Sequence, residues 1–244
     1  MIDLHAHVLP AVDDGARDLD EALAMLRVAA ADGTRILCAT PHAHGPDYDV
    51  PVPKAAEAFA TLSRAAAAAG IPIELRLASE VWYRPDLDAV ARAGSLVPLA
   101  AAGRRYVLVE FPPTHLPAEA EETYFRLRLE GFVPVIAHPE RNPAFWADPK
   151  KVERLREQGA LVQVTAGSLT GMFRAEARKC AKDLVKRRAV DLIASDCHRA
   201  ERRPPGLSEA ARVLERWAGR AEAERLTVGV PQAVLAGTAA PTAA

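Results

Sequence analysis

The sequence predicts an α/β protein whose parallel sheet closes into a TIM-like barrel. Seven short apolar runs alternate with longer amphipathic segments along nearly the whole chain. Each intervening helix returns the chain to the same edge of the sheet, so that consecutive strands run parallel. With seven strands, closure into a barrel is the natural arrangement, and the active site is then expected at its C-terminal face. An open, doubly wound sheet is the alternative architecture.

The expected strands are short and apolar. They cover residues 2–4, 35–39, 73–78, 106–109, 133–137, 161–164 and 192–194. The expected helices cover residues 19–31, 54–69, 118–130, 149–158 and 175–187. Asp18 and Asp148 are expected N-caps because a short side-chain oxygen can accept from a free helical N–H group. A glycine ends a helix just before the next strand at four places: Gly33, Gly70, Gly131 and Gly159.

Composition and charge limit the classes of protein to which the chain can belong. The chain has 244 residues, is 50% hydrophobic and carries a formal net charge of −1. These values predict one globular domain, placed at 1–236, with a flexible tail at 237–244, and no nucleic-acid partner. No apolar run is long enough for membrane insertion, and the first residues do not resemble a signal peptide. Three widely spaced cysteines fit a reducing cytoplasm, and a homo-oligomer is compatible with the sequence.

Histidines and carboxylates gather where the expected strands end. His5 and His7 lie two residues apart, so that a strand directs both side chains to one face. Because the carboxyl ends of parallel strands meet at one face, residues that follow different strands are expected to converge. Six of the seven strands contribute, and the candidate metal ligands are His5, His7, Asp14, His42, Glu80, Glu110, His138, Asp196 and His198.

These ligand types point to a catalytic metal cluster. Imidazoles and carboxylates without thiolates suit Mn, Zn or Fe rather than a structural zinc site. Nine ligands exceed the needs of one ion, so that two or three ions are expected. Such clusters polarise phosphoryl groups and generate hydroxide near neutral pH. The sequence therefore predicts a phosphoester hydrolase with a metal-bound hydroxide as nucleophile.

The chain resembles the PHP (polymerase and histidinol phosphatase) superfamily over about residues 1–230. The resemblance is carried by the ordered segments IDLHAHVLPAVDDGA, ATPHAHG, ASE, LVEFP, IAHPER, QVTAGSLTG and SDCH. More narrowly, these segments are similar to the bacterial manganese-dependent protein-tyrosine phosphatases encoded with capsule and exopolysaccharide genes. The resemblance implies a distorted TIM-like (β/α)7 barrel of the PHP type that holds three metal ions.

The resemblance also implies a role for each site residue. The implied ligand sets are His5, His7, Glu80 and Asp196; then Glu80, Glu110 and His138; then Asp14, His42 and His198. Arg141 is the implied catalytic residue and binds the substrate phosphate. A guanidinium can grip two phosphate oxygens in a fork, which a lysine cannot reproduce.

The function expected from these residues is hydrolysis of phosphotyrosine on a protein. The expected cofactor is Mn²⁺, with Fe or Zn as alternative occupants. The implied partner is a bacterial tyrosine autokinase that controls capsular and exopolysaccharide synthesis. One alternative is a PHP phosphatase for a small phosphomonoester such as histidinol phosphate. Another is a metal-binding module that regulates the kinase without turnover.

Several polar residues beside the expected site are not expected to bind metal. His44 and Arg199 are candidate substrate contacts; a solvated loop position is the alternative for each, and it is the favoured alternative for Arg199. Asp13 is expected to orient its loop rather than to bind metal. Cys197 and Arg203 have the Cys-x5-Arg spacing of thiol-dependent tyrosine phosphatases. The residues between them include no glycine for a phosphate-binding loop, so that a catalytic thiol is not expected.

Overall fold

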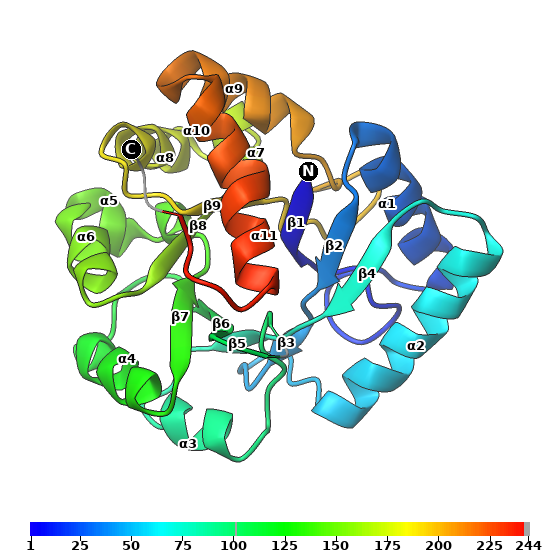
Figure 1. Cartoon of the computed structure of the whole chain (residues 1–244), viewed down its shortest axis with the longest axis horizontal. Helices are drawn as coiled ribbons and strands as arrows, with labels where there is room; N and C mark the ends of the chain where they lie inside the picture. The colour runs from blue at the N-terminus through cyan, green and yellow to red at the C-terminus, as the bar shows by residue number, and fades with distance from the viewer. Residues whose placement is uncertain (101, 242–244) are drawn as a thin grey trace.

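A computed structural model describes residues 1–100 and 102–241. Within these residues, nine short strands form a curled parallel sheet with helices around its outside (Figure 1). The strands are β1 (Ile2–Ala6), β2 (Ile36–Ala39), β3 (His42–Ala43), β4 (Glu74–Leu77), β5 (Glu80–Trp82), β6 (Arg105–Glu110), β7 (Phe132–Ile136), β8 (Leu161–Thr165) and β9 (Leu192–Ala194). All seven expected strands are present, and the prediction of a parallel α/β fold is confirmed.

The strands pair in two sheets, β1-β2-β4 and β3-β5-β6-β7-β8-β9, and every pairing is parallel. Backbone contacts connect the two sheets where β1 meets the segment after β9. Ala6 forms an isolated parallel bridge with Cys197, and the Asp196 N–H group donates to His5 O at 2.8 Å. The carboxyl ends of β1 and β9 therefore lie side by side.

Two short strands, β3 and β5, depart from the predicted pattern. Pro41 has no N–H group to donate to the ladder, so that pairing stops after β2 and resumes at β3. The Ser79 N–H group donates to Val97 O instead of to the sheet, which separates β4 from β5. As a result, His42 and Glu80 are the first residues of strands, and they pair directly in register.

The described helices are α1 (Leu19–Asp32), α2 (Val52–Ala68), α3 (Leu87–Arg92), α4 (Ala120–Leu129), α5 (Pro143–Ala147), α6 (Lys150–Glu157), α7 (Ala166–Thr170), α8 (Ala175–Lys186), α9 (Ser208–Ala218), α10 (Arg220–Glu224) and α11 (Val230–Leu235). A 3-10 turn η1 (Pro139–Arg141) and a π-helical stretch η2 (Arg225–Gly229) complete them. The five expected helices are α1, α2, α4, α6 and α8. Most of the others have five or six residues, which is too short to show a helical period.

The predicted helix ends are supported by their caps. The Asp18 carboxylate accepts from the Glu21 N–H group at 2.8 Å, as expected for the N-cap of α1. Asp148 accepts from the Lys150 N–H group at 3.1 Å, but α6 begins one residue later than expected and its N-cap position is Pro149. Gly33 ends α1 with φ = 98°, a left-handed conformation that favours glycine.

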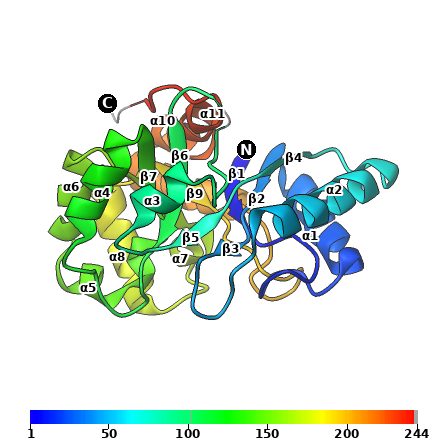
Figure 2. The ribbon, with the colours of Figure 1, turned by 90° about the horizontal axis from the view of Figure 1, so that it is seen from below.

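One end of the curled sheet is closed by the C-terminal helices. Val230 and Val234 of α11 pack in a buried cluster with Ile2 and Leu192, which begin β1 and β9. Figure 2 shows α10 and α11 on one side of the sheet, and α5 and α7 on the other. The C-terminal ends of the strands therefore stay open for side chains that form a site.

The last described residues lie against the domain. The Arg104 N–H group donates to Gly237 O at 2.8 Å, and the Tyr106 hydroxyl donates to Thr238 O at 2.6 Å. Residues 242–244 of the expected flexible tail lie outside the described residues, so that the tail stays a prediction. Over 1–100 and 102–241, no helix combines the length and the hydropathy that crossing a bilayer requires.

Candidate metal centre

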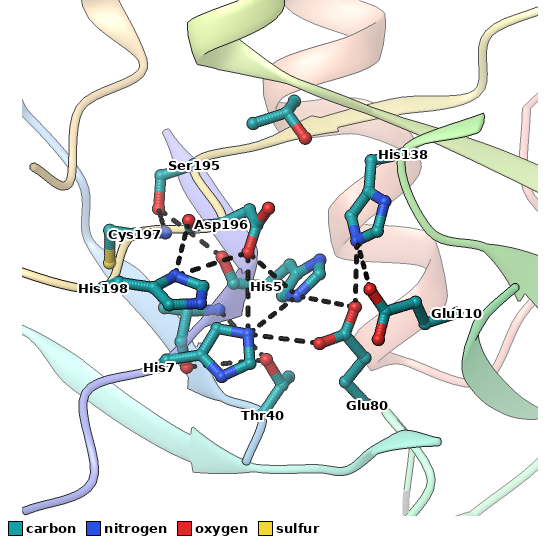
Figure 3. Close-up of polar contacts among 12 residues, drawn as sticks. His5, His7, Thr40, Glu80, Glu110, His138, Ser195, Asp196, Cys197 and His198 are labelled. Atoms are coloured by element: carbon teal, nitrogen blue, oxygen red, sulfur yellow. Dashed lines mark hydrogen bonds and ion pairs between the residues drawn. The ribbon is translucent and has the colours of Figure 1, made fainter. Parts of the chain in front are cut away.

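The carboxyl ends of the strands bring all nine predicted ligands together. β1 carries His5, and His7 follows it; β3, β5 and β6 carry His42, Glu80 and Glu110. The remaining residues come from the loops after β1, β7 and β9: Asp14, His138, Asp196 and His198. Figure 3 shows most of these side chains pointing toward one another from separate strands.

Four overlapping groups of donor atoms lie close enough to hold metal ions, with all atoms of a group within 4.8 Å of one another. The groups are His7–Asp14–His42–His198, His5–His7–Asp196, His5–Glu80–His138 and His42–Glu80–Glu110. Because the groups share residues, they form one continuous cluster. The third implied ligand set appears here with His7 added. Glu80 lies with His5 and His138, as the resemblance implies, but the group that contains both Glu80 and Glu110 has His42 in place of His138. The assignment of each residue to an ion stays a prediction.

Glu80 is the centre of this cluster. Its Oε1 atom lies 3.2 Å from His5 Nε2 and 3.1 Å from His138 Nε2. Its Oε2 atom lies 3.2 Å from both His7 Nε2 and His42 Nδ1. Burial alone would raise the pKa of Glu80, but the neighbouring His5 charge and the His138 and His5 hydrogen bonds hold that pKa well below its usual value. An ionised carboxylate surrounded by four imidazoles is placed to bridge cations through its two oxygens.

Two hydrogen bonds orient the imidazoles of β1. His7 Nδ1 donates to Asp13 Oδ2 at 3.0 Å, since a carboxylate can only accept. His5 Nδ1 lies 3.0 Å from Gln163 Oε1, and the same oxygen accepts from the His138 N–H group at 3.3 Å. Both histidines therefore direct Nε2 into the cluster, where the two nitrogens lie 3.2 Å apart. In the neutral rings these are facing lone pairs, which a cation between them would satisfy.

The other polar atoms of the cluster also fit a divalent cation. Among the described residues, Glu80 Oε2 and Asp14 Oδ1 are buried without a hydrogen-bond partner. Burial and the Glu80 charge raise the pKa of Glu110 to about 8, because two carboxylates share one pocket. Burial and the Arg141 charge lower the pKa of His138 to about 4, which keeps this imidazole in the neutral form that binds metals. The nitrogen and oxygen donors suit Mn, Fe or Zn.

The Asp13–Gly15 turn positions Asp14 in the His7–Asp14–His42–His198 group. A Cβ atom at Gly15 would overlap with His7 O, so that only glycine fits this close approach. The Gly15 N–H group donates to Asp13 Oδ1 at 3.0 Å, and the other oxygen of Asp13 binds His7. Asp14 is then turned toward His198, with Oδ2 3.3 Å from its Nε2 atom. The geometry agrees with the expectation that Asp13 orients the loop.

Arg141 lies at the edge of the cluster, on the η1 turn that follows β7. Its Nη1 atom donates to Asp196 Oδ2 at 2.5 Å, and its side chain is 30% exposed. It lines a cavity of about 90 Å³, partly open to solvent, together with Glu110 and His138. A guanidinium in this place can reach an anion that enters the cavity, and its role in binding phosphate stays a prediction.

Three side chains contact the cluster or its arginines in ways that the sequence did not indicate. Arg203 donates to the same Asp196 oxygen at 2.5 Å, and Phe173 lies under both guanidiniums, 4.7 Å from Arg141 and 5.6 Å from Arg203. Gln163 is the third. A polar residue inside an otherwise apolar, buried strand was the available signal for Gln163. Nothing local in the sequence indicates that Phe173 contacts two arginines.

The two remaining substrate candidates both contact residues of other loops. The His44 N–H group donates to Asp49 Oδ1 at 2.8 Å, and His44 Nε2 lies 2.9 Å from Ser95 O. The Arg199 guanidinium donates to Gly15 O, on the outer side of the Asp13–Gly15 turn. Their roles in substrate binding stay predictions.

Replacing Gln163 by leucine is expected to lower the affinity for Mn²⁺ about 10- to 100-fold. Without the amide oxygen, His5 loses the hydrogen bond that fixes its tautomer and ring orientation. Isothermal titration of metal-stripped protein with Mn²⁺ measures the effect, and Gln232→Leu at an exposed position of α11 is the matched control. Equal affinities of the two variants would show that Gln163 does not orient a ligand.

The chain is similar in sequence to known proteins over most of its length. The family model described as capsular polysaccharide synthesis, CpsB/CapC, matches residues 1–236. The tyrosine-protein phosphatase YwqE of Bacillus subtilis is 35% identical over 219 residues, which cover 90% of this chain and 85% of that protein. The tyrosine-protein phosphatase CpsB of Streptococcus pneumoniae is 27% identical over 240 residues, which cover 96% of this chain and 98% of that protein.

A solved structure shares the whole fold. It comes from the crystal structures of YwqE and CpsB, which are described as unique metal-dependent tyrosine phosphatases. It matches with a TM-score of 0.94 at 32% identity, over 100% of this chain and 97% of that chain. On the match of the family model and the identity to YwqE, this chain belongs to the CpsB/CapC family of capsular polysaccharide synthesis proteins.

Proposed function

We propose that this protein is a metal-dependent tyrosine-protein phosphatase that hydrolyses phosphotyrosine. The observation that carries the proposal is the convergence of nine imidazole and carboxylate side chains beside the Arg141 cavity. The family adds support, because the relatives YwqE and CpsB are tyrosine-protein phosphatases. An anionic phosphomonoester fits a cavity that borders both a metal-binding cluster and a guanidinium.

The side chains in and around the cluster have different roles in binding and catalysis. When bound, the metal ions supply Lewis-acid polarisation of the phosphoryl group and activation of water. Glu80 supplies negative charge between the histidines, and Gln163 and Asp13 keep the imidazoles of β1 correctly oriented. Arg141 binds phosphate oxygens in a fork and orients the phosphorus toward the cluster. Phenolate, whose conjugate acid has a pKa of about 10, is a tolerable leaving group, so that no strong general acid is needed.

We further propose three metal ions, with Mn²⁺ as the resident metal, in a distorted TIM-like (β/α)7 barrel of the PHP type. The curled parallel sheet and the overlapping donor groups support this arrangement. The proposed domain spans 1–236, the range that the family model also matches. The three cysteines are unbridged and buried, which supports the expected cytoplasmic location.

The proposed physiological substrate is an autophosphorylating tyrosine kinase that controls capsular or exopolysaccharide synthesis. The family description, capsular polysaccharide synthesis, supports this partner. Comparison of substrates tests the proposal directly. For the Mn²⁺-loaded protein, kcat/KM for a phosphotyrosine peptide is expected to exceed that for histidinol phosphate by about 100-fold or more. A preference for histidinol phosphate would favour the small-molecule phosphatase. Peptide binding without any hydrolysis would favour the non-catalytic regulator.

Replacing Cys197 by serine is expected to change kcat by less than about threefold. The side chain is fully buried, and burial raises the pKa of its thiol to about 12, so that almost no thiolate forms at neutral pH. Steady-state hydrolysis of phosphotyrosine measures kcat, with Cys38→Ser as a matched control at another buried cysteine. A loss as large as that of Asp196→Ala would instead support a catalytic thiol.

A further inference from the structure

Three surface hollows that share lining residues follow one another away from the proposed phosphate site, and we call them the track. Arg141 lines the cavity beside Glu110 and His138, and it also lines a second hollow with Phe173 and Trp146. Trp146 in turn lines a third hollow, which runs along α8. The turn η1 and helix α5 both pack against α8, so that the track follows one connected surface. A chain that places its phosphate beside Arg141 can therefore continue along α8.

The wall of this track is basic. Lys179, Lys182 and Lys186 stand at positions i, i+3 and i+7 of α8, which places them on one face of the helix. All three side chains are exposed. Among the ion pairs of the described residues, none includes these lysines, whereas Arg187 beside them pairs with Asp183 and Glu153. The Lys182 ammonium group lies 5.4 Å from the centre of the Trp217 ring, a contact that does not neutralise its charge, so that all three charges are available to an anionic partner.

The acidic residues of the same track do not cancel this charge. Asp183 lines the third hollow, but its Oδ2 atom already accepts from Arg187 Nε at 2.8 Å. Glu176 is the other acidic residue there. Arg174, which lines the second hollow, offsets Glu176. The three lysines therefore leave the track with a net positive charge.

We propose that this track along α8 is a docking surface for acidic residues that flank the phosphotyrosine in a protein substrate. The inference rests on the proposed function and adds a substrate preference to it. The positive wall complements carboxylates, and Trp146 and Phe173 offer apolar contacts between them. Helix α8 has 12 residues, and at a rise of 1.5 Å per residue it is about 18 Å long. About five residues of an extended peptide span that length.

The test compares a variant whose charges along the track are reversed with a control variant that has the same change in net charge elsewhere. The track variant is Lys179→Glu/Lys182→Glu/Lys186→Glu. The control variant is Arg27→Glu/Lys54→Glu/Arg64→Glu, at three exposed positions on α1 and α2, on the other side of the molecule from α8 (Figure 1). For each Mn²⁺-loaded protein, kcat/KM is measured with free phosphotyrosine, with a phosphotyrosine peptide flanked by five glutamates, and with the same peptide carrying glutamines.

The ratio of kcat/KM for the acidic peptide to that for free phosphotyrosine is expected to fall about tenfold in the track variant and less than twofold in the control variant. The advantage of the acidic peptide over the glutamine peptide is expected to shrink with added salt in the wild-type protein. Equal losses in both variants would overturn the proposal in favour of a bulk charge effect. A third outcome would overturn the proposal in favour of a membrane surface. In that case only the track variant loses binding to anionic phosphatidylserine vesicles, and the ratio of kcat/KM for the acidic peptide to that for free phosphotyrosine does not change. Absence of free phosphotyrosine hydrolysis in the wild-type protein would refute the proposed function itself.

Discussion

Replacing Glu80 by glutamine is expected to reduce kcat/KM for phosphotyrosine about a thousandfold or more. The carboxylate lies within 3.2 Å of His5, His7, His42 and His138, and among the described residues it is the one placed between these four imidazoles. An amide keeps the shape of the side chain but removes its negative charge and one acceptor oxygen. Loss of about 4 kcal/mol of transition-state stabilisation corresponds to that decrease in rate.

Metal analysis distinguishes this effect from misfolding. Glu80→Gln is expected to retain the fold by circular dichroism and to bind fewer metal ions per chain than the wild-type protein. Glu57→Gln on the exposed side of α2 is the matched control, and its activity and metal content are expected to be those of the wild-type protein. Full metal content and near-normal turnover in Glu80→Gln would contradict the central position of this residue.

Replacing Arg141 by lysine is expected to lower kcat/KM about 100- to 1,000-fold, nearly as much as replacement by alanine. The guanidinium borders the cavity beside Glu110 and His138, where it can grip two oxygens of an anion at once. A lysine keeps the positive charge but not the planar fork, and the loss of one such donor costs about this factor. Steady-state kinetics with a phosphotyrosine peptide measures the effect.

The metal content of the Arg141 variants gives the necessary control. Arg141 contacts Asp196 but supplies no metal-binding atom, so that both variants are expected to bind as much Mn²⁺ as the wild-type protein. Arg64→Lys, on α2, makes the same substitution away from the site and is expected to leave activity and metal content unchanged. If Arg141→Lys kept more than about half of the wild-type activity, the proposed fork-like binding of phosphate would be wrong.

The sequence predicts the strands and the convergence of the site for a physical reason. Parallel strands expose their carboxyl ends at one face, so that His5, Glu110 and His138, which are far apart in the chain, must come close once each strand is located. His42 and Glu80 were expected just after the strands at 35–39 and 73–78, and the structure places them on β3 and β5, which were not expected and which pair the two residues in register. A strand pattern therefore locates the ligands even where it does not show which short strand carries them.

The features that the sequence does not reveal depend on contacts between distant side chains. The hydrogen bond between His5 and Gln163 joins β1 to β8, and the stacking of Phe173 under Arg141 and Arg203 joins three loops. No periodicity or spacing encodes these pairs. Helix α9 was also not expected from the sequence, but for a different reason. Its 11 residues do carry a helical pattern of apolar positions, which could have predicted it.

Metal analysis combined with chelation tests the central claim most directly. The purified protein is analysed for bound metals and assayed with a phosphotyrosine peptide before chelation, after chelation and after addition of Mn²⁺. We expect two or three ions per chain, loss of turnover as the ions are removed, and recovery with Mn²⁺. Full turnover by protein that contains no metal, in excess chelator, would contradict the account.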